Sequence, residues 1–153
     1  MNERHASLLR QHLEAENAQD LDGTLATLHP DCIFQDHATG QLWRGHAGAA
    51  DHYRQWWTTF DVTVSRLEDQ SASWSDDNTF IAESAWSGRH IGDFLGIAAS
   101  GRGIRQRFVV VVSLRDGLMI SERFYYDLAS LLRQIGSDVV PDLIRLPHSA
   151  MAA

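Results

Sequence analysis

The chain has 153 residues, which is enough for one packed domain but not for two. Its formal net charge of −7 argues against nucleic acid as a partner, because phosphate binding needs a basic face. No apolar stretch is long enough to span a membrane, and the first residues lack the apolar core of a secretion signal, so we expect a cytoplasmic protein with no membrane contact.

The basic residues exclude further classes of chemistry. All 13 are arginine, so Schiff-base catalysis, pyridoxal phosphate attachment and lysine-dependent phosphate loops are ruled out. The eight histidines show no metal-site spacing with a carboxylate at a matching offset, and no nucleotide-binding glycine motif occurs. We therefore expect no metal and no cofactor, and any catalysis should use carboxylate, His, Tyr or Arg side chains.

The first part of the chain is predicted to be mainly helical. Helices are expected over residues 3–19 and 21–28, the second capped by Asp20 and closed by His29-Pro30. Short strands are expected over residues 32–34 and 41–44, followed by a helix with a heavy aromatic face over residues 47–60.

The second part is predicted to be mainly strands. One long strand should cover residues 62–74 and another residues 79–90. Two apolar runs flank Asp116-Gly117, which is the strongest short-range signal for a hairpin. A helix after Asp127 should end at Gly136, so one domain would span residues 1–136 and a tail residues 137–153.

This order of elements is typical of an α+β fold. We expect a cone, in which a strongly curved antiparallel sheet packs on the N-terminal helices and leaves a pocket at its open end. The two faces of the hairpin differ by alternation: Phe108, Val110, Val112 and Leu114 share one face, and Arg105, Arg107, Val109, Val111 and Ser113 share the other. Both faces are apolar in mid-strand, so the second is expected to pack on another subunit in a homodimer or larger homo-oligomer.

The most informative single position is Asp127, where a half-buried strand turns into a helix beside Tyr125 and Tyr126. Apolar surroundings disfavour the charged form of a carboxyl group and make it a better base near neutral pH. The same position also suits a helix N-cap that accepts a backbone hydrogen bond. The local sequence leaves both roles open.

Two segments resemble the SnoaL-like polyketide cyclases. Residues 86–101 place Gly88, His90, Gly92, Phe94, Gly96 and Gly101 in a family-like loop pattern. Residues 125–136 place Asp127, Gln134 and Gly136 in a second pattern, while Arg89, Asp93 and Ala98 depart from the usual residues of the first.

The resemblance implies a nuclear-transport-factor-2-like (cystatin-like) cone and a cofactor-independent enzyme. Its reaction would be an intramolecular aldol-type ring closure of a hydrophobic, polycyclic aromatic ester, with Asp127 as general acid/base. His90 would donate to the substrate carbonyl, or else only stabilise its loop.

Further substrate contacts are expected from residues near the pocket. Trp43, Trp56 and Trp57 would be aromatic walls or helix-to-sheet packing. Asp36-His37 would be a second acid/base pair, a hydrogen-bonding couple at the pocket edge, or turn residues. The remaining candidates are Phe34, Phe94, Arg107 and Tyr125.

Two alternatives stay open. An Asp/Arg arrangement of Asp127 or Glu122 with Arg105 or Arg107 would suit an epoxide hydrolase or an isomerase. The second alternative is a non-catalytic small-molecule binding or dimerisation module, in which Asp127 is only a cap.

Overall fold

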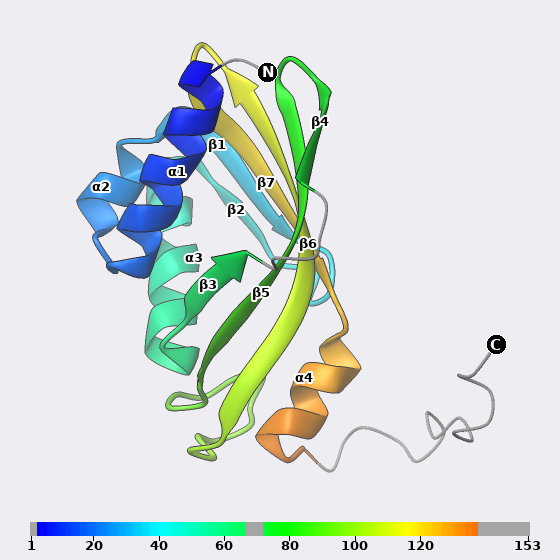
Figure 1. The fold of residues 1–153 in the computed structure, drawn as a ribbon. Helices are drawn as coiled ribbons and strands as arrows, with labels where there is room; N and C mark the ends of the chain where they lie inside the picture. The colour runs from blue at the N-terminus through cyan, green and yellow to red at the C-terminus, as the bar shows by residue number, and fades with distance from the viewer. Residues whose placement is uncertain (1–2, 67–71, 138–153) are drawn as a thin grey trace, which may run out of the picture.

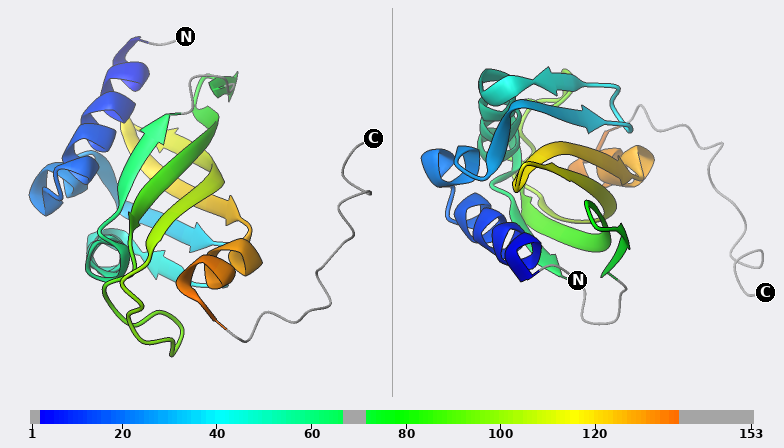
Figure 2. Two further views of the ribbon diagram at one scale, coloured as in Figure 1. Left: turned by 60° about the horizontal axis from the view of Figure 1, so that its bottom comes forward. Right: turned by 90° about the horizontal axis from the view of Figure 1, so that it is seen from above.

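The computed structural model describes residues 3–66 and 72–137. In this part of the chain, a curved sheet has helices α1 to α3 on one side and helix α4 at one end (Figures 1 and 2). The strand order is β2-β1-β7-β6-β5-β3, and β4 also pairs with β5. The predicted α+β fold with a strongly curved sheet is confirmed.

The N-terminal helices form as predicted, with one correction at their end. Helix α1 spans Glu3–Asn17, and α2 spans Leu21–Leu25 with Asp20 as its N-cap. Strand β1 already begins at Leu28 and runs to Asp36, so the predicted helix end at His29-Pro30 is wrong. Pro30 has no N–H to donate, and it lies where the pairing of β1 with β7 is interrupted between Leu28 and Ile33.

Strand β1 departs from the expected all-antiparallel sheet. It pairs antiparallel with β2 (Leu42–Arg44) but parallel with β7 (Leu118–Tyr126). The two parallel strands are far apart in the chain, so no tight turn forces them to be antiparallel. Helix α3 (Gly45–Phe60) follows β2 and packs on β1.

The single strand predicted over residues 62–74 is wrong. Strand β3 (Thr63–Arg66) and strand β4 (Ala72–Asp76) are separate partners of β5 (Thr79–Arg89). Arg66 pairs with Ser84, whereas Ala72 already pairs with Ala82. Between these two pairs β5 moves only from Ser84 to Ala82, whereas the chain opposite it moves from Arg66 to Ala72, so β3 and β4 do not form one continuous ladder with β5.

The predicted hairpin is confirmed. Strand β6 (Gly103–Arg115) and β7 are joined by Asp116 and Gly117, whose φ angles of 52° and 76° match a primed two-residue turn. On β6, Val110, Val112 and Leu114 are buried, while Arg105 and Arg107 are exposed. The inner face of the hairpin therefore faces the helices, as its alternation predicts.

Helix α4 (Leu128–Ile135) begins at Asp127 and ends at Gly136, whose φ of 85° is the left-handed cap expected of glycine. It packs against β6 through Leu131 and Ile135, which join a core cluster with Phe60, Trp86 and Ile104. A second cluster lies between α1, α3 and the inner sheet face. The predicted tail lies almost entirely outside the described residues.

None of the helices in residues 3–66 and 72–137 combines the length and apolar character needed to cross a membrane.

Candidate functional site

Two adjoining cavities lie inside the cone. The first has a volume of about 90 Å³ and lies between α1 and the inner faces of β5, β6 and β7; the second, of about 50 Å³, lies beside α3. Four residues line both cavities: Glu16, Val64, Phe108 and Phe124. Most of the remaining lining is apolar or aromatic, so the few polar side chains define the chemistry.

A directed chain of hydrogen bonds fixes the protonation of His12. Thr27 donates its hydroxyl proton to the Thr24 carbonyl at 2.6 Å, so its oxygen accepts from Nδ1–H of His12, also at 2.6 Å. Nε2 of His12 is then an acceptor, and the Tyr53 hydroxyl donates to it at 3.0 Å. Burial lowers the pKa of His12 to about 4, so this imidazole is neutral near pH 7.

Glu122 completes the buried cluster. It is buried on β7, with its Oε1 3.9 Å from Nε2 of His12. Burial, and then the charge of Glu16, raise the pKa of Glu122 well above its usual range. The raised pKa favours the protonated form of Glu122, a carboxylic acid that can donate a hydrogen bond.

The pKa of Glu16 lies close to neutral pH. It is half-buried on α1 and lines both cavities. Burial raises the pKa of Glu16 to about 7, so an ionised carboxylate and a protonated one coexist around that pH. Glu16 and Glu122 together offer a base and an acid to one apolar space.

The second cavity is bounded by aromatic rings and His52. Its lining includes Tyr53, Trp56, Trp57, Trp86 and Tyr126. His52 is buried, and burial lowers its pKa to about 3. The predicted aromatic wall is thus present at Trp57, whereas Trp43 contacts His52 from outside the cavity lining.

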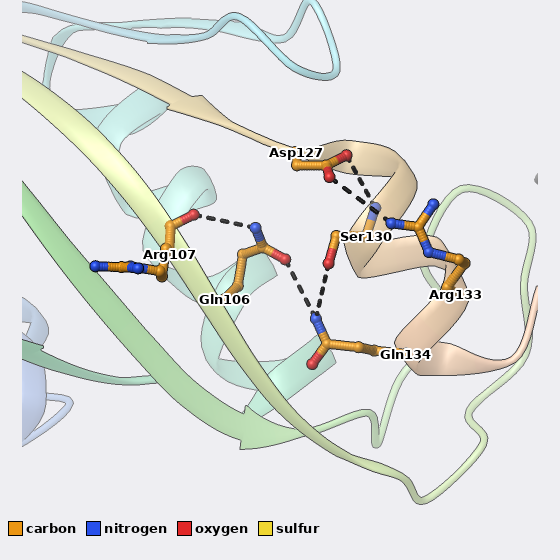
Figure 3. Close-up of polar contacts among 6 residues, drawn as sticks. All are labelled: Gln106, Arg107, Asp127, Ser130, Arg133 and Gln134. Carbon is orange, nitrogen blue, oxygen red and sulfur yellow. Dashed lines mark hydrogen bonds and ion pairs between the residues drawn. The ribbon is translucent and has the colours of Figure 1, made fainter. Parts of the chain in front are cut away.

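Asp127 does not reach either cavity. Its Oδ1 accepts from the Ser130 N–H at 3.0 Å, and its Oδ2 lies 3.8 Å from the Arg133 guanidinium (Figure 3). The side chain is 61% exposed, so the expectation of apolar surroundings is wrong. The N-cap role is confirmed, and the role of Asp127 as a base stays a prediction.

Gln134, a residue of the second family-like pattern, has a structural role. Its Oε1 accepts from the Arg105 N–H at 2.9 Å. Its Nε2 lies 3.4 Å from Gln106 Oε1 and 3.5 Å from Ser130 Oγ (Figure 3). These contacts fasten α4 to β6. The Arg107 side chain is exposed, although its carbonyl accepts from Gln106, and no ion pair among the described residues joins Arg105 or Arg107 to Asp127 or Glu122.

His90 is fully buried in the loop between β5 and β6. Its Nδ1 lies 3.0 Å from the Ser100 hydroxyl and 3.2 Å from the Ser100 backbone nitrogen, and its ring stacks on Phe60. Phe94 is also buried in this region, where it contacts Phe60. These contacts hold the loop together, and neither residue lines the two cavities.

The Asp36-His37 couple is split by the turn that contains it. Asp36 is fully buried, and it accepts from the Ala38 and Thr39 N–H groups and from the Tyr126 hydroxyl at 2.8 Å. His37 points outward and stacks on the exposed Tyr125 ring at 4.4 Å. The two residues therefore do not form an acid/base pair.

A family model for the SnoaL-like domain matches residues 9–122. The chain belongs to this family. No curated protein gives a significant match to the chain.

Solved structures agree with this family in fold. A candidate polyketide cyclase from Xanthomonas campestris pv. campestris is 23% identical, with a TM-score of 0.76 over 87% of this chain and 97% of its own. TsrD from Streptomyces laurentii is 28% identical, with a TM-score of 0.74 over 90% and 98%. A protein of ketosteroid isomerase-like fold from Catenulispora acidiphila, in complex with trimethylamine, is 17% identical, with a TM-score of 0.71 over 85% and 92%.

The polar cluster of this SnoaL-like domain was missed by sequence reasoning. One signal existed on α1, where His12 and Glu16 follow the buried Leu9 at helical spacing and so interrupt an apolar stripe. Another existed on β7, where Glu122 pairs with the inward-facing Val112. Phe34, another predicted contact, is fully buried against Tyr53 and Phe124 and does not line either cavity.

Among the described residues, no group of three or more His, Cys, Asp or Glu side chains is arranged to hold a metal ion. The absence of a cofactor in this SnoaL-like domain stays a prediction.

Proposed function

We propose that the protein is a cofactor-independent enzyme that transfers a proton at a carbon next to a carbonyl group, in a small hydrophobic substrate held inside the cone. The observation that carries this proposal is the pair of carboxyl groups on one apolar cavity, Glu16 and Glu122. Their pKa values are both raised, to about 7 for Glu16 and well above the usual range for Glu122. Few structural roles need two carboxyl groups in such surroundings.

Glu16 would act as the base. A base is most effective when its pKa is close to the working pH, and a raised pKa also strengthens its affinity for the proton. Because Glu16 lines both cavities, a substrate in either one can lie against it.

Glu122 would supply the hydrogen bond that stabilises the developing enolate oxygen. Its carboxyl lies beside the Tyr53–His12 pair, with Oε1 3.9 Å from a His12 Nε2 that already accepts from Tyr53, so its proton is left for the substrate. A donor that is oriented before the reaction needs no reorganisation when charge develops, and its effect is larger where water is excluded.

The aldol-type ring closure of a polycyclic aromatic ester belongs to this class of reaction, because it also begins with an enolate. The family and its structural relatives support this class of chemistry. The cavities of about 90 and 50 Å³ favour a smaller substrate, since sites for drug-sized ligands occupy roughly 300–1,000 Å³. The homodimer and the cytoplasmic location expected from the sequence remain predictions.

The epoxide hydrolase alternative loses its motivation. Among the described residues no arginine lines either cavity, so these residues offer no Asp/Arg pair to a bound epoxide there. The non-catalytic binding module and the enzyme predict different results in the following experiment.

The test is exchange of the α-hydrogens of 2-tetralone in deuterium oxide, followed by NMR. This probe is flat, uncharged and hydrophobic, and it has an acidic carbon beside its carbonyl group. We expect the protein to accelerate exchange over buffer, and Glu16→Gln to lower the rate by roughly 10²–10⁴-fold, which is the usual contribution of a positioned base.

Glu14→Gln is the matched control, since Glu14 lies exposed on the same helix. Asp127→Asn decides between the two candidate bases. Loss of exchange in Asp127→Asn with full activity in Glu16→Gln would refute the proposal and uphold Asp127. No acceleration by the wild-type protein would favour the binding module.

A further inference from the structure

Ser84 interrupts the apolar inner face of β5. Phe80, Ala82 and Trp86 occupy the other alternate positions of this face. Phe80, Ala82 and Ser84 line the first cavity, of about 90 Å³, and Trp86 lines the second. A serine at such a position replaces apolar packing with a hydroxyl group that needs a hydrogen-bond partner.

The Ser84 hydroxyl has no such partner among the described residues. Ser84 is only 6% exposed, and none of the hydrogen bonds in the described part of the chain involves its oxygen. In that part of the chain, the polar side-chain atoms that are both unpaired and wholly inaccessible are His52 Nδ1 and His90 Nε2. The Ser84 oxygen is not one of them, so it keeps accessible surface, and the cavity is the space that it meets.

Ser84 and Glu122 lie at opposite ends of this cavity. Ser84 pairs with Phe108 of β6, and Glu122 pairs with Val112 of the same strand. Val112 lies four residues beyond Phe108, which is roughly 13 Å along the strand. Between the two levels, Val110 makes the wall apolar. A ligand that contacts both ends therefore needs a polar group at each end and apolar atoms between them.

The size and the charges of the cavity restrict this ligand further. One water molecule needs about 10–15 Å³, so a cavity of about 90 Å³ has room for about six non-hydrogen atoms. Among the described residues no arginine lines it, and the low pKa of His12 keeps this imidazole neutral near pH 7, so an anion would meet no positive charge. A cation would hold Glu16 in its ionised form and weaken it as the proposed base. The arrangement therefore favours an uncharged ligand.

We infer that Ser84 determines substrate specificity: its hydroxyl binds the second oxygen of a compact, uncharged aliphatic hydroxy ketone, whose carbonyl oxygen lies at Glu122. The inference deepens the proposed function, on which it rests for the position of the carbonyl group. It assigns a substrate class of about six non-hydrogen atoms without an aromatic ring.

NMR titration of the protein with two ligands of equal size tests the inference. The ligands are 4-hydroxy-2-butanone and 2-pentanone, which differ by a hydroxyl group in place of a methyl group. The affinity for the hydroxy ketone divided by the affinity for the ketone defines a preference. Comparing this preference between variants removes the difference in hydrophobicity between the two ligands.

Ser84→Ala removes the hydroxyl group and keeps the rest of the strand. It should bind 4-hydroxy-2-butanone roughly two- to tenfold more weakly than wild type does, the value of one neutral hydrogen bond, and 2-pentanone at least as tightly. Its melting temperature should not fall, because no hydrogen bond within the described protein is lost. Ser87→Ala is the matched control: Ser87 is exposed on the same strand and lines neither cavity, so both affinities should stay at the wild-type level.

An unchanged preference in Ser84→Ala would mean that the hydroxyl meets only water, and it would overturn the inference. So would the absence of binding by both ligands.

Both ligands also have α-hydrogens and are smaller than 2-tetralone, so their exchange in deuterium oxide separates the two proposals. A preference that depends on Ser84, without accelerated exchange of either ligand, would uphold the binding role of Ser84 and refute the enzyme. Accelerated exchange with the same preference in wild type and Ser84→Ala would uphold the enzyme and overturn the role of Ser84.

Discussion

Glu16→Gln should make the protein more stable in mild alkali and have little effect in mild acid. The pKa of Glu16 rises from 4.5 to about 7 on folding, so the folded state holds its proton more tightly than the unfolded state. A group of this kind contributes stability below its unfolded pKa, and the contribution is lost as the pH rises through the folded pKa. Glutamine resembles the protonated carboxyl and does not ionise, so it removes this loss.

The size of the effect follows from linkage. With these two pKa values, ionisation costs about 0.8 kcal/mol near pH 5 and about 3.4 kcal/mol near pH 8.5. Because part of the carboxyl meets solvent, screening reduces the difference, and we expect Glu16→Gln to gain about 1–2.5 kcal/mol over wild type between these two conditions.

Urea unfolding followed by tryptophan fluorescence, at both pH values, measures this gain. Glu14→Gln should show no comparable pH dependence, since Glu14 is exposed on the same helix. An equal effect of Glu16→Gln at both pH values would mean that the carboxyl is not buried as the structure has it, and the case for Glu16 as the base would fail with it.

Three further outcomes are expected. In urea unfolding, Asp127→Ala should lower the free energy of unfolding by about 1 kcal/mol. Asp127→Asn should lower it by less, because asparagine caps a helix nearly as well as aspartate. A larger loss in Asp127→Asn would contradict a role of Asp127 as a cap alone. Thr27→Val leaves Nδ1–H of His12 without its acceptor, and it should cost about 1–3 kcal/mol in the same assay, with Thr58→Val on the exposed face of α3 as the control. If the outer sheet face forms a dimer, Val111→Arg should convert it to a monomer in light scattering, and a monomeric wild type would refute that interface.

Local sequence signals predicted most of the fold because each one acts over a few residues. The Asp116-Gly117 turn, the cap at Asp127 and the helix stop at Gly136 all depend on backbone conformation at single positions. The errors arose where tertiary pairing decides the outcome. His29-Pro30 predicts a helix end, but Pro30 lies in an interrupted strand pairing. The long strand predicted over residues 62–74 is broken by its register with β5.

The candidate site could not be predicted in the same way, because its groups are far apart in the chain. His12 and Glu16 come from α1, Tyr53 from α3 and Glu122 from β7. Each is ordinary in its local sequence, and only the closure of the cone brings them to one cavity. The perturbed pKa values are likewise a property of the fold, since burial is their main cause.

Asp127 shows the opposite case, in which a strong local signal has a structural explanation. Its carboxylate caps α4, pairs with Arg133, is largely in solvent and lines neither cavity. Glu16, Glu122 and His52 instead destabilise the folded state through burial, and apolar replacements at such positions would make a more stable protein. Side chains that lower stability at the wall of a cavity are better candidates for function than one that raises it at the surface, which is why we place the chemistry inside the cone.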